Sequence, residues 1–151
     1  MPRDMHDVWL KHAELFGYQM SKDPEFKVGA CVVSMNNRQV SFGYNGFPRG
    51  ADERSDAWED KHGRVIHAEL NAILNAEFNT AGCKLYCSTI PCHVCLGQAI
   101  NAGITHVYYV TPIKTFSIIN YDIWNEYSRL FVECKDSLQL NLERDADECS
   151  H

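Results

Sequence analysis

Long apolar runs are missing from this sequence: no uninterrupted stretch of apolar residues exceeds four among its 151 residues. A helix that crosses a membrane needs about 20 such residues, so the pattern excludes one. Residues 1–11 are polar and contain no apolar signal core. We therefore expect a soluble, cytoplasmic protein.

Positive charge is also scarce. Lys and Arg total 14 against 20 Asp and Glu, which gives a net charge of −6. Broad binding to nucleic acid or to anionic membranes needs a basic surface, so we expect neither partner. A small basic pocket for one phosphate is still compatible with this balance. The length suits one domain, which we assign to residues 1–142, with 143–151 as a flexible acidic tail.

Cysteine, in contrast, is plentiful. The chain has seven, an odd number, and no visible secretory signal. This combination disfavours a disulfide scaffold and favours metal binding by the clustered cysteines. We expect the others to be small core residues, namely Cys31, Cys83, Cys87 and Cys134.

Apolar periodicity and turn residues predict alternating helices and strands. In the second half, strands alternate with helices, which implies parallel pairing and a sheet covered on both faces. Residues 46–64 form a long polar connection, a type that is usually functional or disordered. The expected elements are a helix over 4–20, strands over 28–34 and 39–44, a helix over 66–78, a strand over 83–89, a helix with Pro91 in its first turn and Gly103 at its end, a strand over 105–110, a helix over 121–131 and a weak edge strand over 138–142.

Two short motifs combine residues that bind zinc. The first is His67-Ala68-Glu69, and the second is Pro91-Cys92-His93-Val94-Cys95. Cys92 and Cys95 are three residues apart, about 60° around a helix, and therefore share a face. The start of a helix favours thiolates, the form that binds zinc. With His67 as the third ligand, one tetrahedral position stays open for water, as catalytic zinc requires.

Glu69 lies two residues from His67, about 200° around a regular helix. The two side chains can therefore share a site only beyond the N-terminus of their helix. Two thiolates and a neutral imidazole would leave the zinc centre without formal net charge, so its bound water needs a separate base, and we assign Glu69 as this catalytic acid and base. One alternative is a closed structural zinc site in which Cys83 and Cys87 join the C-x-x-C pair, which would leave Glu69 idle. His93 is a rival ligand, but its position faces away from the two cysteines.

The two motifs match the H-x-E … P-C-x-x-C pattern of zinc-dependent nucleobase deaminases. Across roughly 5–112, further segments follow in order: SKDP at 21–24, VGAC at 28–31, GYNGFPRG at 43–50 and HAELNAI at 67–73. With these segments the chain resembles the deoxycytidylate deaminases of the cytidine/deoxycytidylate deaminase superfamily. The resemblance implies a three-layer α/β/α fold with a five-stranded mixed sheet. It also implies zinc-dependent conversion of dCMP to dUMP and ammonia, which feeds dTMP synthesis.

The resemblance further implies substrate contacts. Asn45 is expected to hydrogen-bond the sugar hydroxyl, although Asn before Gly is also a common turn residue. The backbone N–H of Ala68, at a helix start, is placed to bind the pyrimidine O2. The base pocket is expected to be lined by Ser88, Thr89 and Ile90. Candidates for binding the phosphate, or for simple surface solvation, are Ser21, Lys22 and Lys114.

Members of this family are often hexamers that dCTP activates and dTTP inhibits, and Mg²⁺ can accompany such triphosphates. A similar arrangement here would use the residues Gly43, Tyr44, Asn45, Gly46 and Arg49. The following loop carries three more cations, Arg54, Lys61 and Arg64, and arginine forks suit phosphates. The same loop is rich in acidic residues, so a solvated mixed-charge loop is the alternative.

Three other functions stay open. A tRNA adenosine deaminase has the same zinc motif, but the acidic balance counts against it. A free nucleoside or a 5-substituted dCMP could be the substrate, because the pocket around C5 cannot be read from sequence. A non-enzymatic, zinc-stabilised binding module would need zinc for folding but would not need Glu69.

Overall fold

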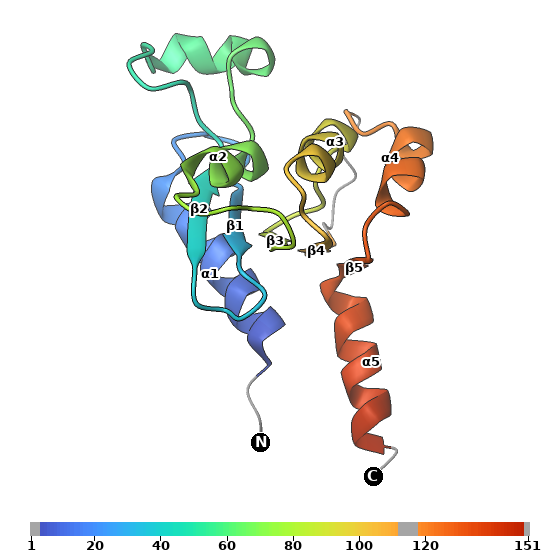
Figure 1. Cartoon of the computed structure of the whole chain (residues 1–151). Coiled ribbons are helices and arrows are strands. Elements are labelled where there is room, and N and C mark those ends of the chain that lie inside the picture. Colours follow the sequence, from blue (N-terminus) through green and yellow to red (C-terminus); the bar gives the residue numbers. More distant parts are fainter. Residues whose placement is uncertain (1–3, 112–117, 150–151) are drawn as a thin grey trace.

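The structure, a computed structural model, describes residues 4–111 and 118–149 (Figure 1). Its centre is a five-stranded sheet of order β2-β1-β3-β4-β5. β1 pairs antiparallel with both β2 and β3, whereas β3, β4 and β5 run parallel. The predicted mixed sheet is therefore confirmed. The strands are β1 (Gly29–Val33), β2 (Val40–Tyr44), β3 (Lys84–Cys87), β4 (His106–Tyr109) and β5 (Glu133–Asp136).

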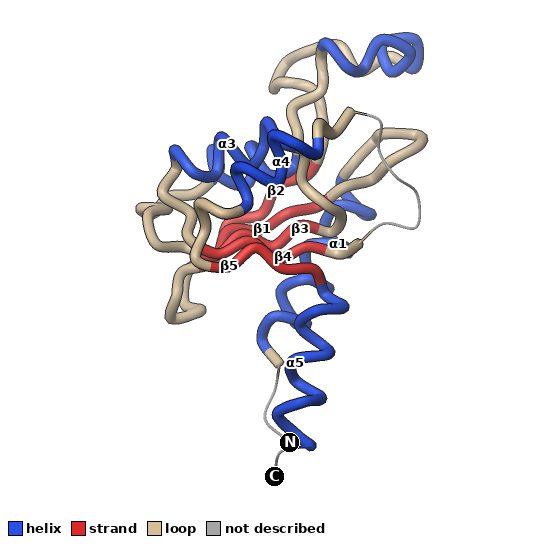
Figure 2. Tube along the Cα trace, turned by 90° about the vertical axis from the view of Figure 1, so that its right-hand side faces the viewer, coloured by secondary structure: helices blue, strands red, loops and turns tan. Residues whose placement is uncertain are grey.

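Helices cover both faces of the sheet (Figures 1 and 2). One face carries α1 (Met5–Met20) and α5 (Ser137–Cys149), and the other carries α2 (Ala68–Asn75), α3 (His93–Asn101) and α4 (Tyr121–Ser128). The 3-10 segment η1 (Ser55–Gly63) lies in the long connection between β2 and α2. Within the described residues, no helix combines the length and apolar character needed to cross a membrane.

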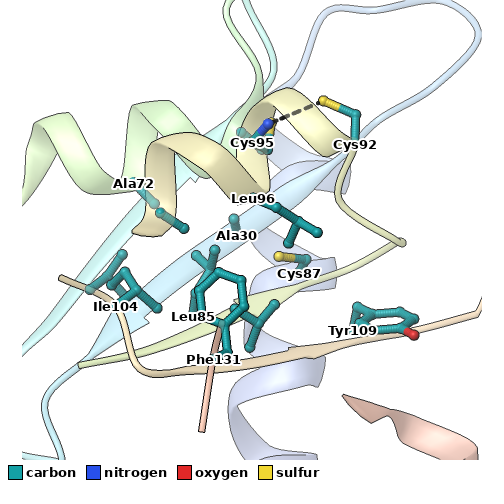
Figure 3. Close-up of a cluster of buried hydrophobic side chains, with 14 of the residues drawn as sticks. Ala30, Ala72, Leu85, Cys87, Cys92, Cys95, Leu96, Ile104, Tyr109 and Phe131 are labelled. Atoms are coloured by element: carbon teal, nitrogen blue, oxygen red, sulfur yellow. Dashed lines mark hydrogen bonds between the residues drawn. The ribbon is translucent and has the colours of Figure 1, made fainter. Parts of the chain in front are cut away.

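The alternation of side chains along β1 builds two cores. Ala30 and Val32 face the layer of α2 and α3, while Cys31 and Val33 face α1, and all four are fully buried. Figure 3 shows the first of these clusters, with Ala30 and Leu85 beneath Leu96 of α3. β1 is thus buried on both of its faces, as is typical of a strand in a sheet covered on two sides. The helices that carry the two zinc-binding motifs are packed on it.

The C-terminal part differs from the sequence prediction. The fifth strand is Glu133–Asp136, and the expected edge strand over 138–142 is wrong, because these residues belong to α5. Residues 143–149 continue that helix, so the proposed boundary at 142 falls inside α5, and the flexibility of the tail stays a prediction. The assignment of one domain to residues 1–142 stays a prediction.

Candidate active site and metal centre

The N-termini of α2 and α3 bring three metal-binding side chains together. His67 caps α2, Cys92 caps α3, and Cys95 lies in the first turn of α3. Their ligand atoms lie 3.3–3.5 Å apart, with 3.4 Å between the two sulfurs and 3.3 Å between His67 Nδ1 and Cys95 Sγ. Ligands about 2.0–2.3 Å from a tetrahedral zinc ion are roughly 3.5–3.8 Å from one another. The donor set and its spacing therefore fit Zn²⁺.

The start of α3 favours the thiolate form of Cys92. Its sulfur accepts a hydrogen bond from the Cys95 backbone N–H (Figure 3) and lies 3.4 Å from the Cys95 sulfur. The interaction with the Cys95 side chain, aided by His67 and by the Cys95 backbone N–H, lowers the pKa of Cys92. The sequence suggested Pro91 in the first turn of this helix, but Pro91 lies one residue before the N-cap, Cys92. At the other end, Gly103 follows the C-cap residue Ala102 with a positive φ of 83°.

The structure does not assemble the alternative ligand sets. Within residues 4–111 and 118–149, the cluster with metal-ligand spacing consists of His67, Cys92 and Cys95. Cys83 donates instead to the carbonyl of Asn79, and Cys87 is fully buried in the core. Burial raises the pKa of both thiols. His93 also lies outside the cluster and accepts a hydrogen bond from the backbone N–H of Asn120.

Glu69 places a carboxylate against this cluster. It lies in the first turn of α2 and is 3% exposed, and its Oε2 lies 3.3 Å from Cys95 Sγ, which donates to it. The geometry confirms that residues two apart can share a site beyond the helix start. Burial raises the pKa of Glu69, whereas a bound cation would act in the opposite sense. A carboxylate in this position can exchange protons with a ligand in the adjacent cavity.

A cavity of about 340 Å³ opens beside the cluster. That volume lies within the range of small-molecule sites. Its walls include His67, Glu69 and Cys92 together with Ala68, Thr89 and Ile90. The hydroxyl of Thr89 is buried and, within the described residues, has no hydrogen-bond partner. Since buried polar groups are normally paired, this hydroxyl is available to a bound ligand.

Asn45 lines the same cavity but is already engaged. Its Oδ1 accepts from the backbone N–H of Val28 at 2.9 Å, and its Nδ2 donates to the carbonyl of Phe26 at 2.8 Å and to Asp23 at 3.3 Å. An amide oxygen can accept two hydrogen bonds. The predicted contact with a sugar hydroxyl would therefore use the second one, and it stays a prediction.

Three other predicted substrate residues, Ser21, Lys22 and Ser88, do not line the cavity. Ser21 donates to the carbonyl of Asn45, and Ser88 accepts from the backbone N–H of Gly29. Lys22 is exposed and forms an ion pair of 2.9 Å with Glu53. Lys114 lies outside the described residues.

The GYNG segment, residues 43–46, contacts α2, the helix that carries Glu69. A Cβ on Gly43 would overlap backbone atoms of Ala68 and Ala72, so glycine lets α2 lie directly on β2. The carbonyl of Tyr44 accepts a hydrogen bond from the Asn71 side chain. Gly46 pairs with Ile66, and Arg49 donates to Asn75.

Sequence reasoning missed two residues of the cavity wall. Lys61 and Asp23 both line the cavity, and the Lys61 ammonium lies 3.3 Å from both oxygens of Asp23. The two residues are 38 positions apart, and nothing local in the sequence brings them together. The sequence placed Lys61 among the cations of the loop but gave no sign that it turns inward.

Comparison with protein families decides the classification. Residues 3–111 match the family model described as the cytidine and deoxycytidylate deaminase zinc-binding region. The chain belongs to this deaminase family. The segment matched contains both zinc-binding motifs, Glu69 and the GYNG segment.

Curated relatives in this family include deaminases from bacteria and animals. An uncharacterised deaminase of Aliivibrio fischeri is 43% identical over 118 residues, which cover 74% of this chain and 79% of the relative. The deoxycytidylate deaminase of Homo sapiens is 39% identical over 102 residues, covering 62% and 57%. A probable deoxycytidylate deaminase of Drosophila melanogaster is 38% identical over 119 residues, covering 70% and 59%. The matched part thus spans less than two thirds of the length of the human and fly relatives.

A solved structure of the same family resembles the whole fold. The dCMP deaminase of the cyanophage S-TIM5, in complex with dCMP and dUMP, superposes with a TM-score of 0.72 at 30% identity. The match covers 90% of this chain and 98% of that one. The apo form of the same phage enzyme gives a TM-score of 0.69 at 29% identity.

Proposed function

We propose that this deaminase hydrolyses dCMP to dUMP and ammonia. The observation that carries the proposal is the buried Glu69 carboxylate beside the His67–Cys92–Cys95 cluster, in the wall of a cavity that suits a small molecule. The similarity to the phage enzyme solved with dCMP and dUMP supports the choice of substrate. The acidic net charge of −6 supports a small substrate over tRNA.

The chain's own residues account for the proton transfers. Zn²⁺ held by His67, Cys92 and Cys95 would supply Lewis-acid activation of a water molecule. Two thiolates and a neutral imidazole cancel the formal charge of the ion, so a separate base is needed. Glu69 takes a proton from the attacking water and delivers it to N3 of the cytosine. Once the new C4–O bond has formed, Glu69 takes the remaining proton of that hydroxyl and passes it to N4, so that the C4–N4 bond breaks, ammonia leaves and C4 becomes a carbonyl.

The cavity wall would orient the nucleotide. The backbone N–H of Ala68, at the start of α2, is assigned to the pyrimidine O2. Thr89 and Ile90 are assigned to the base, and the unpaired hydroxyl of Thr89 supports this assignment. Asn45 is assigned to the sugar hydroxyl through its remaining acceptor site. Ser88 holds Gly29 behind this wall.

We also propose that the enzyme works in the cytoplasm as a homohexamer, that its product feeds dTMP synthesis, and that dCTP and dTTP regulate it together with Mg²⁺. The resemblance of residues 43–50 to the effector-binding segment of the family supports the regulation by dCTP and dTTP. A second cavity of about 400 Å³, whose lining includes Pro48, Arg54 and Arg64, adjoins that segment and could take a triphosphate. A dCMP titration that is hyperbolic and unchanged by dCTP or dTTP would overturn the regulatory part.

A substrate panel tests the main proposal. The zinc-loaded protein is assayed for ammonia release from cytidine, deoxycytidine, CMP, dCMP, 5-methyl-dCMP, dCTP and adenosine, and tRNA is assayed for inosine. We expect the highest kcat/KM for dCMP. A higher value for a nucleoside or for 5-methyl-dCMP would reassign the substrate, and inosine formation in tRNA would reassign the class.

A further inference from the structure

We propose that the Lys61 ammonium, which Asp23 holds in the cavity wall, binds the 5′-phosphate of the nucleotide substrate. This inference rests on the proposed deamination of dCMP. It assigns the phosphate to a residue of η1, the segment that precedes the zinc-binding helix α2. None of the phosphate candidates suggested by the sequence is required for it.

The position of Lys61 is the first argument. Its side chain is 12% exposed and lines the same cavity as His67 and Glu69. Within the described part of the chain, it is the single Lys or Arg in the lining of this cavity. Lys22, in contrast, is 72% exposed, is paired with Glu53 and lies outside the lining. A phosphate in the cavity would therefore meet Lys61.

The second argument is that Asp23 fixes the ammonium in place. Asp23 is 3% exposed in its side chain, and its Oδ1 accepts from the backbone N–H groups of Glu25 and Phe26. Asn45 also donates to its Oδ2. Lys61 Nζ lies 3.3 Å from both oxygens of this anchored carboxylate and 5.1 Å from the centre of the Phe26 ring. A flexible lysine is thus held in one geometry before a ligand arrives, which lowers the entropy cost of binding.

The third argument concerns the unused capacity of the ammonium. It has three N–H donors, and the contacts with Asp23 account for two. The nearest oxygen of Glu25 lies at 4.0 Å, too far for a hydrogen bond. One donor is therefore left for a ligand. A phosphate monoester carries a charge of about −1.5 to −2 at pH 7, and its attraction to a largely buried ammonium is stronger than in open water.

This arrangement predicts selectivity for nucleotides over nucleosides. Deoxycytidine has a neutral 5′-hydroxyl in place of the charged phosphate, so the Lys61–Asp23 pair would contribute little to its binding. A merely structural role of the pair would instead affect both substrates alike. The two substrates therefore separate phosphate binding from support of the cavity wall.

The test compares Lys61→Met with the wild-type chain, both loaded with zinc. We expect kcat/KM for dCMP to fall by about 10- to 100-fold, mainly through KM, because one hydrogen bond between charged groups is lost. For deoxycytidine, kcat/KM as a substrate, or the inhibition constant as a competitive inhibitor of dCMP deamination, should change by less than about threefold. Lys61→Arg keeps the charge and should recover part of the loss. The matched control is Lys11→Met, which removes a lysine paired with Asp7 on the surface of α1. It should leave the kinetic constants for both dCMP and deoxycytidine unchanged.

The double variant Asp23→Asn/Lys61→Met removes both charges and leaves no unpaired buried carboxylate. A persistent selective loss for dCMP supports binding by Lys61. Recovery to nearly wild-type values would mean that unmasked Asp23 merely repels phosphate, and equal losses for both substrates would mean a structural role; either result overturns the inference. A wild-type chain that releases no ammonia from dCMP would instead reject the proposed function.

Discussion

Trp124 donates a buried hydrogen bond of 2.9 Å from its indole nitrogen to the carbonyl oxygen of Pro91. The ring also packs edge-on against Tyr109, with 5.8 Å between centroids. Pro91 directly precedes Cys92, which caps α3 and belongs to the metal cluster. Helix α4 therefore helps to position Cys92, although no residue of α4 belongs to the metal cluster found among the described residues.

Replacing Trp124 with Phe keeps an aromatic ring but leaves the buried Pro91 carbonyl without its donor. We expect a loss of about 1–3 kcal/mol in the free energy of unfolding, together with weaker zinc binding. Urea unfolding with and without a chelator measures both effects. Tyr121→Phe, at an exposed position of the same helix, is the control. Equal stability of Trp124→Phe and the wild type would contradict the role of this hydrogen bond.

The role of Glu69 can be isolated with Glu69→Gln. The amide preserves size and hydrogen bonding but cannot carry the proton, so we expect a folded, zinc-loaded protein whose kcat is lower by about 10²- to 10⁴-fold or more. Zinc content and ammonia release are measured on the same sample. Glu77→Gln, at an exposed position beyond α2, serves as control. Undiminished turnover of the zinc-loaded variant would reject Glu69 as the base and reopen the binding-module interpretation.

Two cysteine variants distinguish the catalytic metal site from a closed four-cysteine site. Cys92→Ser should abolish tight zinc binding, whereas Cys83→Ala should bind zinc as the wild-type chain does, because Cys83 donates to Asn79 outside the cluster. Zinc at about 1,000 times its Kd stabilises a folded protein by roughly 4 kcal/mol. A chelator should therefore lower the Tm of the wild type and of Cys83→Ala, and it should have little effect on Cys92→Ser. Loss of zinc in Cys83→Ala would favour the closed site.

The residues of the metal cluster could be predicted because their placement is local. His67 and Cys92 cap their helices, and Glu69 and Cys95 follow within the first turns. Helix geometry then determines which side chains can reach beyond the helix start. Only the approach of the two helix starts to each other depends on tertiary structure, and the packing of α2 and α3 on the sheet provides it.

The parts that sequence reasoning missed depend on packing or on short windows. Leu138, Leu140 and Leu142 alternate as in a strand, but positions four apart also share a helix face, so five residues cannot decide between the two. The structure forms α5, with Leu138 and Leu142 exposed and Leu140 against the core near α1. Lys61 is a similar case, because its role depends on Asp23, which is distant in sequence.

The packing of α2 on β2 predicts a strong effect at Gly43. In Gly43→Ala the new methyl group would overlap the backbone at Ala68 and Ala72, so α2 must shift, and with it His67 and Glu69. We expect a loss of about 1–3 kcal/mol in stability and a fall in kcat. Gly63→Ala is the matched control, because its methyl group would meet no atom within 4 Å. Thermal unfolding and ammonia release measure both, and similar behaviour of the two variants would contradict the packing argument.

The last prediction concerns acid stability at the β4–β5 edge, far from the metal cluster. The Tyr108 hydroxyl donates to Glu133, and this hydrogen bond, aided by Lys135, lowers the pKa of Glu133. A carboxyl whose folded-state pKa is depressed stabilises the protein above its unfolded pKa of about 4.3, and that contribution is lost as the pH falls through the folded-state pKa. Tyr108→Phe lacks the hydrogen bond, so the wild type should lose more stability than this variant between about pH 5.5 and pH 3.

Urea unfolding of both proteins at the two pH values measures the difference. Metal-free samples are needed, because protonation of the zinc ligands would otherwise dominate the acid response. Glu133→Gln removes the titrating group and should be as insensitive to this pH change as the double variant Tyr108→Phe/Glu133→Gln. If the wild type and Tyr108→Phe lost equal stability, the hydrogen bond would not control the ionisation of Glu133, and the acid response would have to come from other carboxylates.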